Sequence, residues 1–297
     1  MSSDKTFTIV GLGEILWDML PAGKQLGGAP ANFAYHAKAL GAEGVVVSCI
    51  GDDDLGREIS NQLGGLDLDC QYIAVDKSHR TGTVTVKLDD KGVPDFTIHE
   101  NVAWDFIPLS DPLLELAARA DAVCFGSLCQ RSDVSRDTVR RFLEKTKPDC
   151  LRIFDINIRQ SYYSKDIVHT MLETSNVLKL NDDELPLVAQ MLDIKGAESE
   201  ILAELVARYE LRLVVLTKGA EGSRLYGPDG DSESKGVPPE KIADTVGAGD
   251  AFTAAVAVGL LNGNGLEQIN AHANRVASFV CSQHGATPKL PDDLVGG

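Results

Sequence analysis

The segment Asp244–Phe252 combines two glycines, a carboxylate and the start of a helical run. Gly247 and Gly249 let a ligand approach the backbone closely. The helix expected over 251–261 adds unpaired N–H groups and the positive end of its dipole, so the loop can hold a phosphoryl group during transfer. Asp250 stands at the helix start, where an ionised carboxylate can accept the proton of an attacking hydroxyl. The alternative is that Asp250 only caps the helix.

Asn181 and Glu184 form a second candidate pair at the start of another expected helix, 182–191. Side chains three residues apart on a helix face the same side, so both can point into one cleft. The structural alternative is that Asn181 is the N-cap and Glu184 its capping-box partner. Both arrangements can hold at once.

The elements that position these residues follow from short apolar runs that alternate with helical patterns. Near-continuous apolar runs are typical of strands buried on both faces of a parallel sheet. The expected strands are Phe7–Leu12, Val45–Cys49, Ala122–Phe125, Leu151–Phe154, Val177–Leu180 and Leu213–Leu216. The expected helices are Ala31–Leu40, Leu55–Leu63, Val134–Glu144, Asp182–Met191 and Ala251–Leu261. This alternation predicts a doubly wound α/β sandwich in one compact unit, 1–297.

One region departs from this pattern. Thr81–Leu88 and Asp95–His99 alternate apolar and polar residues and are joined by Asp89–Gly92, which indicates an antiparallel hairpin. We expect the segments of about 16–27 and 80–104 to form a small β lid over a cleft; the alternative is an ordinary edge hairpin. The polar alternation permits pairing between two copies, and therefore a homodimer formed through the lid.

Composition and charge narrow the range of partners. Of the 297 residues, 43% are hydrophobic and 24% are charged, as in a globular protein. The net charge of −16 disfavours binding to nucleic acid or to anionic lipid. An anionic ligand would need a local site built from backbone N–H groups, a helix N-terminus and Mg²⁺.

The cysteines and the termini indicate the compartment. The six cysteines form no C-x-x-C pair and no cluster with zinc spacing, which favours reduced thiols in a cytoplasmic protein. The first residues lack the apolar region of a signal peptide, and the apolar stretch 251–261 is too short to span a bilayer. We therefore expect a cytoplasmic protein with no membrane partner.

Five short motifs resemble the signatures of the ribokinase-like pfkB family of carbohydrate kinases. They are Gly27–Ala34 (G-G-x-x-x-N-x-A), Phe154–Arg159 (D-x-N-x-R), Leu180–Glu184 (N-x-x-E), Thr217–Gly222 (T-x-G-x-x-G) and Asp244–Phe252. Each motif alone is a weak signal, but five in family order are a strong one. The resemblance implies a ribokinase-like three-layer α/β/α sandwich with a mostly parallel central sheet, and an ATP-dependent sugar kinase.

The resemblance also implies roles for the glycine loop. Asp250 would be the catalytic base. The backbone N–H groups of Ala248, Gly249 and Asp250, in the loop that begins at Gly247, would form the anion hole. Because phosphoryl transfer needs little covalent help from a protein, alignment and charge neutralisation would supply most of the acceleration.

For the sugar, the resemblance implies contacts with Asp18, Gly28, Asn32, Asn157 and Arg159. Carboxylate and amide groups suit adjacent hydroxyls, and a guanidinium can reach a phosphate or a sugar oxygen. Asn157 and Arg159 would share one face if their strand continued. The alternatives are a turn for Asp18, a helix surface for Asn32 and a structural salt bridge for Arg159.

For the nucleotide and the metals, the resemblance implies a further set of contacts. The expected ATP contacts are Asn181, Thr217, Gly219, Gly222 and Asn274. Glu184 would hold Mg²⁺ through water, since Mg²⁺ keeps much of its hydration. The Asp244 carboxylate and the carbonyls of Val246 and 281–286 would hold an activating K⁺.

The choice of sugar rests on finer similarities. Segments 11–18, 27–34, 101–105 and 126–132 resemble bacterial fructokinases, which favours D-fructose and its conversion to fructose 6-phosphate. A 2-keto-3-deoxygluconate kinase, a ribokinase and a non-catalytic sugar-binding protein are the alternatives. The sequence has no P-loop motif, and Leu16 stands where a dinucleotide fingerprint requires its third glycine.

Overall fold

The computed structural model describes residues 6–20, 23–88, 94–239 and 241–295. Its central sheet has the strand order β13-β12-β11-β10-β9-β8-β1-β4-β5. The parallel strands are β1 (Thr8–Leu12), β4 (Glu43–Gly51), β5 (Ile73–Asp76), β8 (Ala122–Phe125), β9 (Leu151–Asp155), β10 (Val177–Asn181) and β11 (Leu213–Thr217). At one edge, β12 (Ser223–Gly227) and β13 (Gly230–Ser234) add antiparallel pairs.

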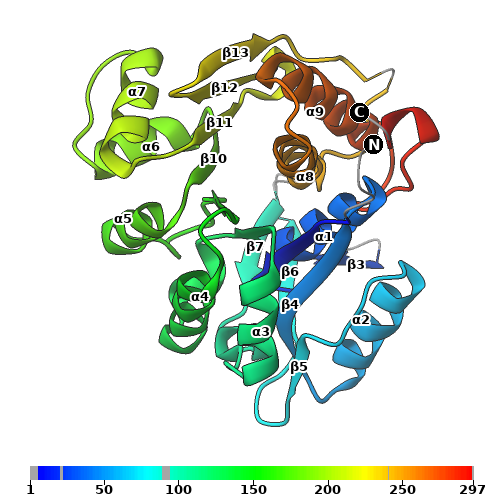
Figure 1. Cartoon of the computed structure of the whole chain (residues 1–297). Coiled ribbons are helices and arrows are strands. Elements are labelled where there is room, and N and C mark those ends of the chain that lie inside the picture. Colours follow the sequence, from blue (N-terminus) through cyan, green and yellow to red (C-terminus); the bar gives the residue numbers. More distant parts are fainter. Residues whose placement is uncertain (1–5, 21–22, 89–93, 240, 296–297) are drawn as a thin grey trace.

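Helices cover both faces of this sheet (Figure 1). One face carries α1 (Ala29–Ala39), α2 (Asp54–Gly65), α8 (Ala248–Leu261) and α9 (Leu266–Cys281). The other carries α3 (Asp111–Arg119), α4 (Asp133–Lys145), α5 (Lys165–Thr174), α6 (Glu184–Met191) and α7 (Glu198–Tyr209). Short 3₁₀ turns are η1 (Ala103–Phe106), η2 (Leu128–Arg131), η3 (Gly219–Glu221) and η4 (Asp292–Leu294). The predicted three-layer α/β/α sandwich is therefore confirmed.

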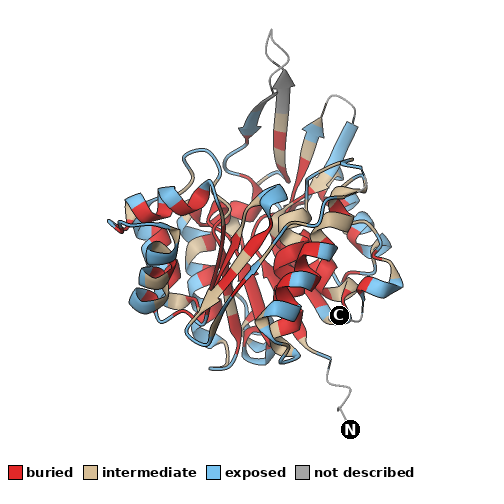
Figure 2. Cartoon of the chain, turned by 90° about the horizontal axis from the view of Figure 1, so that it is seen from above, coloured by how far each residue is buried: buried red, intermediate tan, exposed pale blue. Residues whose placement is uncertain are grey.

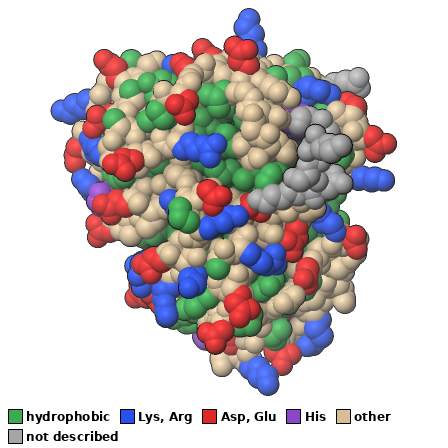
Figure 3. Space-filling model, viewed as in Figure 1, with side chains coloured by type: hydrophobic (Ala, Val, Ile, Leu, Met, Phe, Trp, Pro, Cys, Tyr) green, Lys and Arg blue, Asp and Glu red, His purple; other side chains and the backbone are tan. Residues whose placement is uncertain are grey.

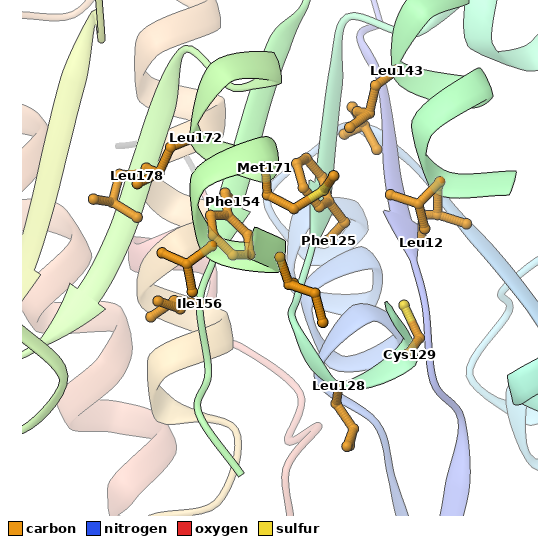
Figure 4. Close-up of a cluster of buried hydrophobic side chains, with 14 of the residues drawn as sticks. Leu12, Phe125, Leu128, Cys129, Leu143, Phe154, Ile156, Met171, Leu172 and Leu178 are labelled. Atoms are coloured by element: carbon orange, nitrogen blue, oxygen red, sulfur yellow. The ribbon is translucent and has the colours of Figure 1, made fainter. Parts of the chain in front are cut away.

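Side chains alternate between the two faces along each parallel strand, which explains the continuous apolar runs in the sequence. Val177 packs in the cluster under α8 and α9, whereas Leu178 packs in the cluster under α3–α7. Figure 4 shows the second cluster, where the rings of Phe125 and Phe154 stack with centroids 5.6 Å apart. Buried residues fill the interior while the helices expose their outer sides (Figure 2).

The predicted strands are all present, but the helix starts differ from the predicted ones. The helix expected at 251 begins three residues earlier, at Ala248, and those expected at 55 and 134 each begin one residue earlier. The helix expected at 182 begins at Glu184, because Asp182 and Asp183 form a turn after β10, in which the Asp182 N–H donates to the Thr217 carbonyl (3.0 Å). The helix expected at 31 begins at Ala29, with Pro30 in its first turn, where a missing N–H costs nothing.

A second, four-stranded sheet has the order β3-β2-β6-β7. It consists of β2 (Leu16–Leu20), β3 (Gly23–Gly27), β6 (Gly82–Leu88) and β7 (Pro94–Ile98). The predicted antiparallel hairpin is confirmed as β6 and β7, although its expected turn, 89–92, lies outside the described residues. The strands 16–27 join it through parallel pairing of β2 with β6.

Arg131 fastens the root of this second sheet to the sandwich. Its guanidinium binds both carboxylate oxygens of Asp105 (2.8 and 2.9 Å) and donates to the carbonyl of His99, just after β7. It also lies between the rings of Trp104 and Tyr162, 4.0 and 4.7 Å from their centroids. The side chains of Arg131 and Asp105 are only 8% and 4% exposed.

We expect Arg131→Met to lower the free energy of unfolding by about 3 kcal/mol, because it leaves a buried carboxylate without its partner. Denaturant unfolding measures this change. Arg57→Met, which removes an exposed ion pair with Asp54, is the matched control and should leave the midpoint unchanged. Equal midpoints for wild type and Arg131→Met would contradict the assignment.

None of the described helices has the length and apolar character that a membrane crossing requires. On the face shown in Figure 3, basic side chains are interspersed with acidic ones.

Candidate active site

The chemistry-bearing residues gather where the chain order of the sheet reverses, at the carboxyl ends of β8 and β9 beside β1. In open α/β sheets this reversal leaves a crevice between diverging loops. A small cavity at this point is lined by Ala29, Pro30, Cys124, Phe125, Gly126, Asp155, Asn157 and Asp250. Segments far apart in the sequence thus meet at the start of α8.

The first turn of α8 has the geometry of an anion site. Gly247 is the residue before the helix and has φ +80°, a left-handed value that favours glycine. The N–H groups of Gly249 and Asp250 have no acceptor among the described residues, while that of Ala248 lies 3.4 Å from the Thr245 carbonyl. Two free N–H groups and the positive end of the helix dipole are therefore both available to an anion at the N-terminus of α8.

Asp250 does not cap this helix, so the capping alternative is wrong. It is the third residue of α8, and its Oδ2 accepts a hydrogen bond from Nδ2 of Asn32 on α1 (2.8 Å). Burial and the nearby Asp155 carboxylate raise the pKa of Asp250 to about 6. Asn32, Lys179 and Arg159 act in the opposite direction.

This pKa gives a pH prediction. A base must be ionised to accept a proton, so kcat/KM should fall as the pH drops through about 6, the value for the free protein. The profile should stay flat from pH 7 to 8. A pH–rate series with a sugar that the protein turns over checks this, and a limb near pH 4 would contradict the raised pKa.

The expected sugar-binding residues surround this centre. Asp18 lies on β2 and not in a turn, and burial raises its pKa although the Arg159 charge opposes the rise. Asn32 is buried and bound to Asp250, so the helix-surface alternative is wrong. Gly28 has φ +119°, and a Cβ there would lie 2.5 Å from the Glu14 carbonyl.

Asn157 and Arg159 follow β9, which ends at Asp155, so strand alternation does not set their directions. Asn157 has φ +43° and lines the small cavity. Arg159 is exposed, and its guanidinium donates to the carbonyl of Ile158 (3.0 Å). No ion pair of Arg159 occurs within the described ranges, so the structural salt bridge is not formed there.

Asn181 and Glu184 form the reciprocal hydrogen bonds of a capping box. Asn181 Oδ1 accepts from the Glu184 N–H (2.8 Å), and Glu184 Oε2 accepts from the Asn181 N–H (2.9 Å). Glu184 Oε1 accepts from the Ile158 N–H (2.9 Å). A carboxylate has about four acceptor positions, so two remain for water molecules on a metal.

Three of the nucleotide candidates lie at the carboxyl end of β11 and in the turn that follows it. Thr217 ends β11, and Gly219 and Gly222 bound η3 with φ +53° and +108°. A Cβ on Gly222 would lie 2.0 Å from the Ser234 carbonyl, so only glycine fits there. Asn274 is buried, and its Nδ2 donates to Ser223 Oγ (2.7 Å) and to the Asn270 backbone, which makes it a structural link.

The candidate potassium loop is closed by its own hydrogen bonds. Asp244 accepts from the Val246 and Gly285 N–H groups, at 3.0 and 3.3 Å. The Ala286 carbonyl accepts from Nε2 of the buried His36 (2.9 Å), whose pKa is lowered by burial to about 4, so the ring is neutral. Asp244 and Val246 are thus adjacent, whereas the Ala286 carbonyl already has a partner.

Three buried charged residues near this centre were not among the predicted site residues. Asp155 and Lys179 form an ion pair at 3.0 Å, and Glu14 has an Oε2 with no partner in the described part of the chain. Burial raises the pKa of Glu14 to about 7. The available signal was a lysine inside the apolar run of β10, since a charge in a buried strand needs a partner.

Another surface pocket, of ≈ 290 Å³, lies between α4 and α5. Its arginines, Arg136 and Arg140, already pair with Asp133, Asp137 and Glu144 of their own helix. The pocket with convergent carboxylates and free N–H groups is therefore the better candidate, although it is smaller.

Comparison with known proteins agrees with this geometry. Residues 22–293 match the family described as pfkB family carbohydrate kinase. The chain belongs to the pfkB family of carbohydrate kinases. The free N–H groups of α8 and the Asp250 carboxylate lie in the segment that resembles this family's C-terminal signature.

Relatives of this pfkB kinase differ in the sugars that their names give. A fructokinase from Klebsiella pneumoniae is 30% identical over 95% of this chain and 96% of its own length. A 5-dehydro-2-deoxygluconokinase from Bacillus cereus is 27% identical over 90% of this chain and 83% of its own. The crystal structure of a fructokinase double mutant from Vibrio cholerae, with fructose, ADP and potassium bound, is 25% identical, covers 97% and 96% of the two chains and has a TM-score of 0.78.

Proposed function

We propose that this pfkB kinase transfers the γ-phosphoryl group of ATP to the 6-hydroxyl of D-fructose. The observation that carries the choice is the charge of the sugar side of the site. Three carboxyl groups, those of Glu14, Asp18 and Asp250, interact electrostatically with a single exposed cation, Arg159, which lowers the pKa of each. Carboxylates accept hydrogen bonds from the hydroxyls of a neutral sugar and repel an acidic one.

The proposed reaction uses the groups at the start of α8. Asp250 takes the proton of the sugar hydroxyl as that oxygen attacks the γ-phosphorus in line. The N–H groups of Gly249 and Asp250 stabilise the charge on the transferring phosphoryl oxygens. The sugar phosphate and ADP leave, and the proton on Asp250 returns to solvent.

ATP and two metal ions complete the proposal. Thr217, Gly219 and Gly222 would border the nucleotide, and Asn181 would lie near its phosphates. Mg²⁺ would be held through water by Glu184, which retains free acceptor positions. Potassium would bind at Asp244 and Val246, as the potassium-bound relative suggests, and would strengthen the anion site beside it. The second sheet would close over the sugar as a lid.

The second candidate is a kinase for a sugar acid such as 2-keto-3-deoxygluconate. Arg159 favours it, because it is the exposed cation beside the acids and has no carboxylate partner in the described ranges. A guanidinium binds a carboxylate with two parallel hydrogen bonds. The acids around Arg159 would oppose this binding, so we place fructose first.

The test is an ADP-release assay with Mg²⁺ and ATP in KCl or in NaCl. The sugars are fructose, ribose, glucose and 2-keto-3-deoxygluconate. We expect the highest kcat/KM with fructose and a higher rate in KCl. A preference for the sugar acid would replace fructose by the second candidate. Sugar binding in calorimetry without ADP release would instead support a non-catalytic sugar-binding protein.

A further inference from the structure

A buried ion pair lies directly under the candidate anion site. Nζ of Lys179, on β10, is 3.0 Å from Oδ1 of Asp155, the last residue of β9. The two side chains are 9% and 6% exposed. Burying two charges is costly and does not by itself stabilise a fold, so the position of the pair needs a reason.

The pair is connected to the first turn of α8 on both sides. Oδ2 of Asp155 lies 3.4 Å from Oγ1 of Thr253, and the same hydroxyl donates to the Gly249 carbonyl at 2.9 Å. Nζ of Lys179 lies 3.5 Å from the place that a Cβ on Gly249 would occupy. Two strands of the sheet and the glycine loop therefore meet at one buried positive charge.

The charges around Asp250 come from several elements. The ionisable groups that act on it or respond to it are Glu14, Cys124, Asp155, Arg159 and Lys179. Asp155 raises the pKa of Asp250, and Lys179 and Arg159 lower it. Burial works against the charge of Lys179, but Asp155 and Glu184 raise its pKa above its ordinary value, so it stays an ammonium.

We propose that Lys179 and Asp155 are positioning residues for phosphoryl transfer: they hold the first turn of α8 on the sheet and supply the buried cation that lets Asp250 ionise. Lys179 balances Asp155 and Asp250 together, so that two carboxylates can be charged side by side. Asp155 fixes the ammonium and lies against the Thr253 hydroxyl, which donates to the Gly249 carbonyl. The catalytic consequence rests on the proposed function, but the effect on Asp250 does not.

The test follows the Asp250 carboxyl by ¹³C NMR over a pH series, with Asp250→Asn used to assign its signal. Lys179→Met should raise the pKa of Asp250 by about one pH unit, because it removes a cation and frees Asp155 to repel. Asp155→Asn should lower the pKa by a similar amount, because it removes the repelling anion. A role limited to packing predicts no such opposite shifts.

The double variant Lys179→Met/Asp155→Asn keeps the site neutral and guards against unfolding of Lys179→Met. Its Asp250 pKa should lie between those of the two single variants. Lys165→Met, which breaks an exposed pair with Asp193, should change nothing. An unchanged pKa in folded Asp155→Asn, or shifts of the same sign in both single variants, would overturn the proposal.

Kinetics then separate this inference from the proposed function. With a sugar that is turned over, Lys179→Met should lower kcat/KM about fivefold at pH 6, because a one-unit rise in the pKa of Asp250 cuts its ionised fraction there by about that factor. Opposite NMR shifts in a protein that phosphorylates no sugar would keep the positioning role and reject the kinase assignment. Full activity at pH 6 together with unmoved NMR signals would reject the positioning role alone.

Discussion

Replacing Asp250 by asparagine should lower kcat about 10²–10⁴-fold. The amide has nearly the same shape as the carboxylate and can still accept the hydrogen bond from Asn32, now 2.8 Å long. It cannot take a proton from the sugar hydroxyl, so the loss should fall on the chemical step and leave ATP and sugar binding nearly unchanged. Steady-state kinetics and calorimetric binding with the same preparations measure the two effects.

The same substitution should stabilise the protein above pH 6. Because the folded state raises the pKa of Asp250 from 3.8 to about 6, ionising this group disfavours folding at every pH above that range. The Asp250→Asn variant carries no such penalty, so its Tm should exceed that of the wild type at pH 8 and nearly match it at pH 4. Asp193→Asn, at an exposed position, is the control that should keep full activity. Wild-type turnover in Asp250→Asn would remove Asp250 as the base.

Local sequence is sufficient to predict the α/β/α sandwich because the strands of its sheet are buried on both faces. Such strands are apolar at every position, and the helices between them end at recognisable residues, such as Gly41 with φ +95°. Only half of the second sheet could be predicted from local sequence in this way. The β6–β7 hairpin alternates visibly, but β2 pairs with β6 across a long stretch of chain, and no local pattern specifies that pairing.

The site shows the same limit more sharply. The motifs indicated Asn32 and Asp250 separately, yet their hydrogen bond joins residues 218 positions apart. The sequence indicates Asn274 as an ATP contact, but it gives no sign that the amide of this residue also ties α9 to β12. Local sequence identifies Lys179 only as part of a strand, because its ion pair forms with Asp155 in the neighbouring strand. A role that depends on two segments far apart in the sequence can be assigned only from the three-dimensional structure.

Gly247→Ala should lower kcat about 10²-fold, the second large effect that we expect. Gly247 has φ +80°, and a Cβ there would lie 2.5 Å from the Ala286 carbonyl oxygen and 2.8 Å from its Cα and Cβ. His36 holds that carbonyl at 2.9 Å, so the loop around Ala286 cannot yield easily. The helix start must move instead, and the free N–H groups of Gly249 and Asp250 move with it.

Gly263→Ala separates this effect from simple backbone strain. Gly263 follows the other end of α8 with φ +75°, nearly the same conformation, and a Cβ there would meet nothing within 4 Å. Both alanine variants should lose about 1 kcal/mol of stability from the left-handed conformation. Only Gly247→Ala should lose turnover, because only its Cβ displaces the anion site. Equal turnover in the two variants would mean that the N–H groups at the start of α8 do not act on the phosphoryl group.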